Sequence, residues 1–105
     1  MRIVKITEDF IEFDNGKDIS FEHDQECCEI NYADFDQLDS LARDVDFSEP
    51  LVFESCDYGF RFGNPPINMF FVPCYSIQNG YYSSELDIWY DGKEVIHGIE
   101  CPVAS

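Results

Sequence analysis

Basic residues are scarce in this sequence of 105 residues. Six Lys and Arg stand against 22 Asp and Glu, which gives a formal net charge of −16 with both histidines neutral. This balance disfavours direct binding to nucleic acid, because the phosphates would repel the chain, and it disfavours anionic membrane surfaces for the same reason. The predicted partners therefore include neither nucleic acid nor a membrane.

Long apolar runs are also missing. No stretch approaches the roughly 20 apolar residues of a transmembrane helix. The acids Glu8 and Asp9 follow the N-terminal segment before the apolar region of an export signal could form. We therefore expect a cytoplasmic protein.

Recognisable catalytic motifs are absent as well. The sequence contains no P-loop and no dinucleotide-binding glycine pattern. The acids Glu26 and Glu29 flank Cys27 and Cys28, which favours the protonated thiol over the thiolate that cysteine catalysis needs. We predict that the protein is not an enzyme, with no catalytic residues and no cofactor.

The apolar content indicates a folded core. The chain is 45% hydrophobic and 16% aromatic, which is too much apolar surface for a disordered chain. A length of 105 residues suits one domain, so the prediction is a single domain covering residues 1–105.

The first half of the sequence predicts a β-hairpin. Residues 10–13 and 19–21 alternate apolar with polar side chains, the period of a half-buried strand. Asp14-Asn15-Gly16 between them is a turn signal. A three-residue loop with a left-handed Gly16 places Ile11 opposite Ile19, and we prefer it to a two-residue loop that places Glu12 there.

A helix is predicted next. Asp34 has the position of an N-cap, with Gln37 three residues later. The spacing then places five apolar residues on one side, and Pro50 marks the latest possible end. These apolar residues are Phe35, Leu38, Leu41, Ala42 and Val45.

The second half predicts strands. Apolar runs around residues 51–53, 58–62, 67–77 and 86–90 are separated by turn signals, and Pro73 inside the third run indicates an edge, a bulge or an interruption. A two-residue Asp91-Gly92 turn would place Ile88 opposite Val95 and Leu86 opposite His97. The predicted fold class is α+β, a mainly antiparallel sheet of about six strands in hairpins with one helix packed on a face.

Two short motifs resemble those of an uncharacterised family of small acidic bacterial and phage proteins, a domain of unknown function. One is His23-Asp24-Gln25-Glu26-Cys27-Cys28-Glu29, a His-x-Gln-x-Cys-Cys-Glu pattern that follows a strand. The other is the later turn Asn79-Gly80-Tyr81-Tyr82-Ser83. The resemblance covers about a fifth of the chain; it implies a shared fold and supplies no activity.

The cysteines have two interpretations. Five cysteines without an export signal indicate reduced thiols, most of them small buried apolar residues. The alternative is a zinc-binding or regulatory domain, because His23 and Cys27, like His97 and Cys101, are four residues apart and would supply a tetrahedral ligand set. We prefer the first interpretation and predict no metal.

The acidic charge carries the functional hypothesis. Residues 8–49 hold 15 of the 22 acids and only two basic residues, and the net charge exceeds the magnitude of about 2–8 that keeps a small domain soluble. Acids gathered on one side of the fold would imitate a polyanion and attract a basic partner. The predicted contact residues are Asp34, Asp36, Asp39, Asp44 and Asp46, with Glu26 and Glu29 as a second cluster and Tyr81 and Tyr82 as aromatic contacts.

The most specific hypothesis is a small acidic protein-interaction module, an inhibitor or immunity-type protein. Its partner would be a basic nucleic-acid-processing enzyme such as a nuclease toxin. This partner class comes from an analogy of size and charge with the small acidic immunity proteins that neutralise bacterial nuclease toxins. A DNA-mimicking antagonist of a host factor would use the same physics and stays an alternative.

Overall fold

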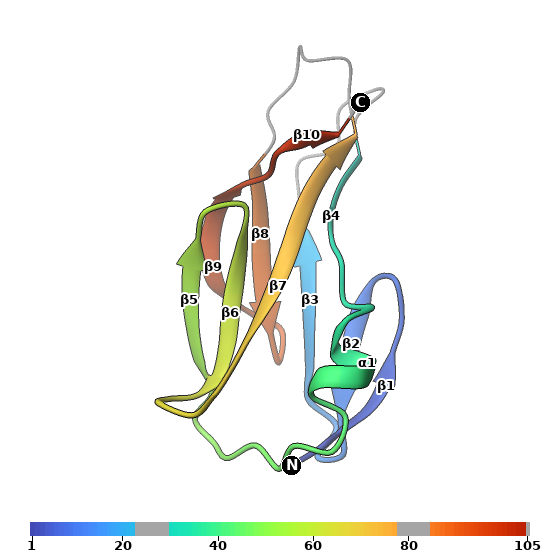
Figure 1. The fold of residues 1–105 in the computed structure, drawn as a ribbon, viewed down its shortest axis with the longest axis vertical. Coiled ribbons are helices and arrows are strands. Elements are labelled where there is room, and N and C mark those ends of the chain that lie inside the picture. Colours follow the sequence, from blue (N-terminus) through green and yellow to red (C-terminus); the bar gives the residue numbers. More distant parts are fainter. Residues whose placement is uncertain (23–29, 78–84, 105) are drawn as a thin grey trace.

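The computed structural model describes residues 1–22, 30–77 and 85–104, which form ten strands and one short helix. Figure 1 shows two layers of strands that face each other. No helix within the described residues is long and apolar enough to cross a membrane.

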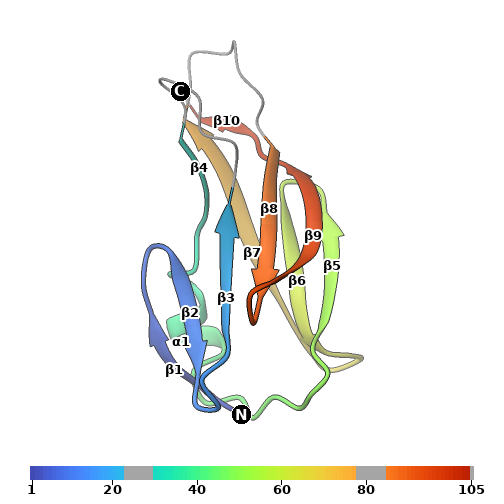
Figure 2. The same ribbon diagram turned by 180° about the vertical axis from the view of Figure 1, so that it is seen from behind.

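The first layer is an antiparallel sheet in the order β1-β2-β3-β8-β9. Figure 2 shows this layer from behind, with β3 beside β8. The N-terminal hairpins therefore meet the last hairpin of the chain. The strands are β1 (Ile3–Ile6), β2 (Phe10–Phe13), β3 (Asp18–Glu22), β8 (Glu85–Tyr90) and β9 (Lys93–Glu100).

The second layer has the order β10-β7-β6-β5, and β4 also pairs with β7. All of its pairings are antiparallel except that of β10 with β7. The long strand β7 therefore holds this layer together. The strands are β4 (Ile30–Ala33), β5 (Val52–Cys56), β6 (Gly59–Asn64), β7 (Asn68–Ile77) and β10 (Val103–Ala104).

Pro73 marks the place where β7 changes partners. β6 pairs with β7 from Asn68 as far as Pro73, and β4 pairs with it from Cys74 onward. The carbonyl of Pro73 accepts the N–H of Asp34 at 2.8 Å. Of the three predicted alternatives, an edge fits best: β7 runs unbroken through Pro73, which pairs with Gly59 of β6, while the pairing with β4 ends at Cys74.

The core lies between the two layers and is rich in phenylalanine. The ring of Phe47, from the segment between α1 (Leu38–Leu41) and β5, contacts Phe13 of the first layer and Phe62 of the second, with centroids 5.8 and 5.6 Å away. Phe13, Phe47 and Phe62 are all buried. One aromatic side chain from a connecting segment thus joins the two sheets.

The first hairpin has the predicted register. Ile11 pairs with Ile19, and Gly16 has a φ of +87° in a three-residue loop. Both isoleucines are fully buried. The burial of the apolar face and the left-handed glycine therefore select the same register.

The predicted register of the last hairpin is wrong beyond its turn. Asp91 and Gly92 form the expected two-residue turn, but Ile88 pairs with Ile96 and Leu86 pairs with Ile99. Two irregularities in β9 shift the pairing. They keep Ile96 and Ile99 in the core, a register that a regular hairpin cannot give.

The predicted helix is shorter than expected. It spans four residues, Leu38–Leu41, and its N-cap is Gln37 rather than Asp34. Turns with i→i+3 hydrogen bonds precede it, from Leu38 to Phe35 and from Asp39 to Asp36. Asp44 and Val45, which follow soon after Ala42, have low helix propensity, so the helix does not extend beyond its first turn.

The apolar side of this segment is only partly as predicted. Phe35, Leu38 and Ala42 are buried, Val45 is half-buried and Leu41 is 57% exposed. The helix is too short to present one continuous stripe, so Leu41 points away from the core.

The prediction of about six strands in one sheet is also wrong. The described residues form ten strands in two layers, and the helix fills the open side between the layers instead of covering a sheet face (Figure 1). The mainly antiparallel character is confirmed. Strands as short as β1, β4 and β10 give too few residues for a period-two pattern.

The cysteines within the described residues are free thiols. Cys74 and Cys101 are buried and Cys56 is half-buried. A hydrogen bond with Cys101, together with burial, raises the pKa of the Cys74 thiol. Cys74 and Cys101 confirm the prediction of small buried apolar residues, and Cys27 and Cys28 lie outside the described residues.

Glu49 links its own connecting segment to the β2–β3 loop and to the end of β8. Its Oε1 lies 2.8 Å from Lys17 Nζ, accepts a hydrogen bond from the Tyr90 hydroxyl at 2.8 Å and lies 3.5 Å from Asn15 Nδ2. Lys17 and Tyr90 hold the pKa of Glu49 below its usual value. The ionised form is thus favoured in the folded state.

We expect Glu49→Gln to lower the free energy of unfolding by about 1 kcal/mol at pH 7. A depressed folded-state pKa contributes stability above the unfolded pKa, and this contribution is lost as the pH falls through the folded value. The difference between the two proteins should therefore shrink between pH 5 and pH 3 in urea unfolding. Asp14→Asn, an exposed acid of the β2–β3 loop, is the control. An equal loss by Glu49→Gln at every pH would contradict the charge argument.

Candidate functional site

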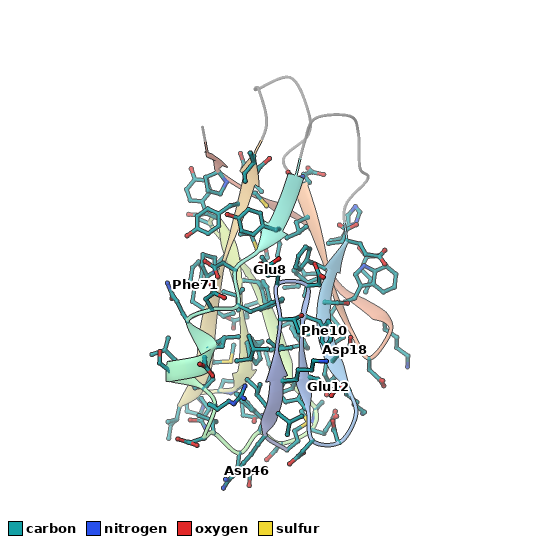
Figure 3. All side chains as sticks on the ribbon, turned by 90° about the vertical axis from the view of Figure 1, so that its right-hand side faces the viewer. Glu8, Phe10, Glu12, Asp18, Asp46 and Phe71 are labelled. Atoms are coloured by element: carbon teal, nitrogen blue, oxygen red, sulfur yellow. The ribbon has the colours of Figure 1, made fainter. Side chains whose placement is uncertain are left out.

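A groove of about 540 Å³ opens between the loop that joins β1 to β2 and the segment that leads from β4 into α1. Figure 3 views the molecule from this side, with Glu8 at the tip of the β1–β2 loop. We call it the acidic groove. It is lined by Glu8, Asp9, Phe21, Asn31, Tyr32, Ala33, Asp34, Phe35 and Asp36.

The floor of the acidic groove is largely apolar. Phe35 and Ala33 are buried, and the ring of the half-buried Phe21 lies 6.0 Å from that of Phe35. Tyr32 forms one wall, and its ring centroid lies 5.6 Å from that of Tyr75 of the second layer, with the two rings tilted by 40°. The half-buried rings of Phe21 and Tyr32 give the groove apolar surface below the polar rim.

The side-chain amide of Asn31, at the floor of the groove, is held in place by two hydrogen bonds. Its Nδ2 donates to the Glu85 carbonyl on β8 at 3.0 Å, and its Oδ1 accepts a hydrogen bond from the Ser76 hydroxyl on β7. Asn31 is 2% exposed. Because β7 and β8 belong to different layers, this side chain connects the two sheets behind the groove.

Four carboxylates form the rim. Glu8 and Asp9 come from one side and Asp34 and Asp36 from the other, and the described residues that line the groove include no Lys or Arg. Four acidic residues that line one hollow give it a negative potential, which attracts cations.

The backbone at both sides of the rim is held by short-range hydrogen bonds. The Thr7 hydroxyl accepts the N–H groups of Asp9 and Phe10 at 3.2 and 3.1 Å. On the other side, Asp34 Oδ1 accepts the N–H of Asp36 at 3.0 Å. Asp34 thus closes a tight turn before the helix instead of capping it, and the rim residues are pre-positioned.

A second depression of about 520 Å³ adjoins the groove and shares Asp36 with it. It also contains Asp39 and Arg43, whose charged groups lie 3.7 Å apart in the predicted i,i+4 arrangement. Lys5 lines the same depression. The acidic groove therefore ends at a neighbouring hollow of mixed charge.

Three of the predicted contact residues lie at these two hollows. Asp34 and Asp36 line the groove and Asp39 lines the adjoining depression. Asp44 is exposed and lines neither. Asp46 lies at the far end of the molecule (Figure 3), where the ammonium group of Met1 at 2.8 Å lowers its pKa.

The remaining predicted residues cannot be placed at the site. Glu26, Glu29, Tyr81 and Tyr82 lie outside the described residues, as do both family-like motifs. Sequence reasoning missed Glu8 and Asp9 as site residues. The turn signal Thr7-Glu8-Asp9 before an apolar–polar alternation was the available indication.

The acids of the described residues do not all gather on one side. On the first layer Glu12 pairs with Asp18 and Glu22 pairs with Asp87, whereas Glu54 on β5 forms an ion pair with Arg61. Figure 3 shows Glu12 and Asp18 close together below Glu8. The expected single acidic side is replaced by one acidic groove and several separate clusters.

The alternative zinc set is not brought together by the described residues. The His97 side chain is 78% exposed and contacts Asp87 and Glu94, while Cys101 is buried beside Cys74. The left-handed Gly98 lies between them and breaks the regular alternation that places residues i and i+4 on one face. His23 and Cys27 lie outside the described residues.

Comparison with known protein families, with curated proteins and with solved structures finds no match for this chain.

Proposed function

We propose that this protein is an acidic interaction module that binds a basic protein at the acidic groove. The observation that carries the proposal is a partly aromatic floor beneath four acidic residues, with no Lys or Arg among the described residues that line the groove. An Arg or Lys side chain fits such a hollow, because its aliphatic stem packs on the half-buried rings of Phe21 and Tyr32 while its charged head reaches the rim.

The net charge of −16 supports this function beyond the groove itself. Attraction between opposite charges raises association rates toward about 10⁸–10⁹ M⁻¹s⁻¹ at low salt. Fast association suits an inhibitor that must neutralise a harmful enzyme before it acts. The acids outside the groove then serve to attract the partner, and the groove serves to hold it.

We propose further that the partner is a nucleic-acid-processing enzyme, such as a nuclease toxin, and that the protein acts as its cytoplasmic inhibitor. Enzymes that hold nucleic acid present clustered Lys and Arg to the phosphates. A carboxylate-lined protein that occupies such a surface excludes the substrate. This step rests on charge complementarity.

Neutralising the groove tests the proposal. The variant Glu8→Gln, Asp9→Asn, Asp34→Asn, Asp36→Asn removes four charges and keeps side-chain size. Proteins are captured from a lysate of the organism that carries the gene, identified and purified. The expected partner is a basic nuclease that the native protein inhibits at a 1:1 ratio. Affinity of the variant should fall at least about 100-fold, because each charged contact contributes about 1 kcal/mol or more.

A variant of equal charge supplies the control. Asp14→Asn, Asp44→Asn, Asp57→Asn, Glu100→Gln also removes four charges, all from exposed residues outside the acidic groove. It should slow association at low salt and retain most of the affinity. Equal losses in both variants, or a captured partner without excess basic residues, would refute the groove as the binding site. A captured host factor without nuclease activity would identify the DNA-mimicking alternative.

A further inference from the structure

Three metal-ligating side chains converge on the outer face of the first layer, away from the acidic groove. His97 Nδ1 lies 3.0 Å from Asp87 Oδ1 and 2.7 Å from Glu94 Oε1. One ligand atom from each residue lies within 4.8 Å of the other two. None of the three lines the acidic groove, so this cluster is independent of the proposed function.

The irregular pairing of β8 with β9 builds the cluster. Register shifts between Leu86 and Trp89 leave more residues on β9 than on the facing part of β8. Glu94 and His97 can therefore both approach Asp87. The N–H of Gly98 donates to Asp87 Oδ1 at 2.9 Å and fixes that carboxylate, as supporting groups do at metal centres.

We infer that Asp87, Glu94 and His97 form a binding site for a divalent transition-metal ion. Metal–ligand bonds of about 2.0–2.2 Å place neighbouring ligand atoms about 3 Å apart, and the His97 nitrogen already has this spacing from both oxygens. One imidazole and two carboxylates favour Zn²⁺ or a related ion over Mg²⁺, which prefers oxygen ligands alone. Water completes the coordination on the exposed side.

The surroundings add negative potential to the site. The carboxylate of Glu85 lies close to Gly98, where a Cβ atom would meet its Oε2 at 3.7 Å. Glu22 faces Asp87 across the β3–β8 pairing. These two acids add to the electrostatic attraction of a dication.

Zinc titration of the full chain by calorimetry at pH 8, where protons compete little for the imidazole, tests the inference. We expect one Zn²⁺ per chain, a rise in the unfolding temperature with Zn²⁺, and no competition from a tenfold excess of Mg²⁺. His97→Ala should weaken binding at least tenfold. Asp87→Asn should do the same while its remaining oxygen still accepts the Gly98 N–H, so that the hairpin stays folded.

The double variant His23→Ala, Cys27→Ser is the control, because those residues belong to the alternative ligand set. It should retain the zinc affinity of the native protein. Unchanged binding in His97→Ala, loss of binding in the double variant, or no saturable binding in the native protein would each overturn the inference. Binding of a basic partner at the acidic groove is measured in a separate experiment, so the outcome of the zinc titration does not decide the proposed function.

Discussion

Replacing Phe62 by alanine is expected to lower the free energy of unfolding by about 3–5 kcal/mol, the range for a buried phenylalanine. Phe62 has no exposed surface, and its ring centroid lies 5.6 Å from that of Phe47 and 6.4 Å from those of Phe53 and Phe70. The change removes apolar contacts with these three rings and with Phe60, whose centroid is 6.3 Å away, and it leaves a cavity that a paired strand cannot close. Urea unfolding at pH 7 measures the loss.

Phe71→Ala provides the matched control. It makes the same chemical change on the opposite face of the second layer, where Phe71 is 41% exposed. We expect a loss of about 1 kcal/mol, because only part of the ring is removed from water. Similar losses in the two variants would show that the core is not centred on Phe62.

The first hairpin could be predicted from the sequence because its signals are local. The turn at Gly16 and the burial of Ile11 and Ile19 point to one register. A shift by one residue would expose both isoleucines and bury Glu12. Local and tertiary preferences agree here, and the prediction is confirmed.

The last hairpin could not be predicted in full, although its turn was. A regular ladder from Asp91-Gly92 would place Val95 and His97 on the face that carries Ile88. The core instead takes Ile96 and Ile99, at a spacing of three residues that a period of two cannot follow without an extra residue. The irregularity depends on packing against β5 and β6, segments far away in the sequence.

The helix shows a conflict between local pattern and tertiary context. Asp34 with Gln37 has the spacing of a capping box, yet the Asp34 side chain closes a turn with Asp36 and its N–H bonds to Pro73 of β7. Pairing of β4 with β7 thus extends past Ala33 and delays the helix. The sequence does not show which distant strand will offer that carbonyl.

Only one side of the acidic groove could be predicted from the sequence. The run of acids from Asp34 to Asp39 was recognised, because acids in a short segment are visible without a fold. Glu8 and Asp9 lie about 25 residues earlier, and only the pairing of β1 with β2 beside β4 brings them to the same hollow. The composition is the basis for proposing a basic partner, but the three-dimensional structure decides which acidic residues share a site.

Replacing Gly63 by alanine is expected to destabilise the protein by about 4 kcal/mol, combining backbone strain with overpacking. Gly63 has a φ of +142°, and a Cβ atom there would lie 1.8 Å from the backbone oxygen of Asn68. The clash is with the backbone of the neighbouring strand, so no rotamer change relieves it, and β6 and β7 would have to separate next to Phe62. Gly16→Ala, with φ +87° and no atom within 4 Å of the added Cβ, carries the strain without the clash and should cost about 1 kcal/mol. Chemical denaturation of both variants separates the two effects. A loss of unfolding free energy at Gly63 no larger than that at Gly16 would mean that β6 and β7 can move apart at little cost. A much larger loss would show that the close approach of the two strands requires glycine at this position.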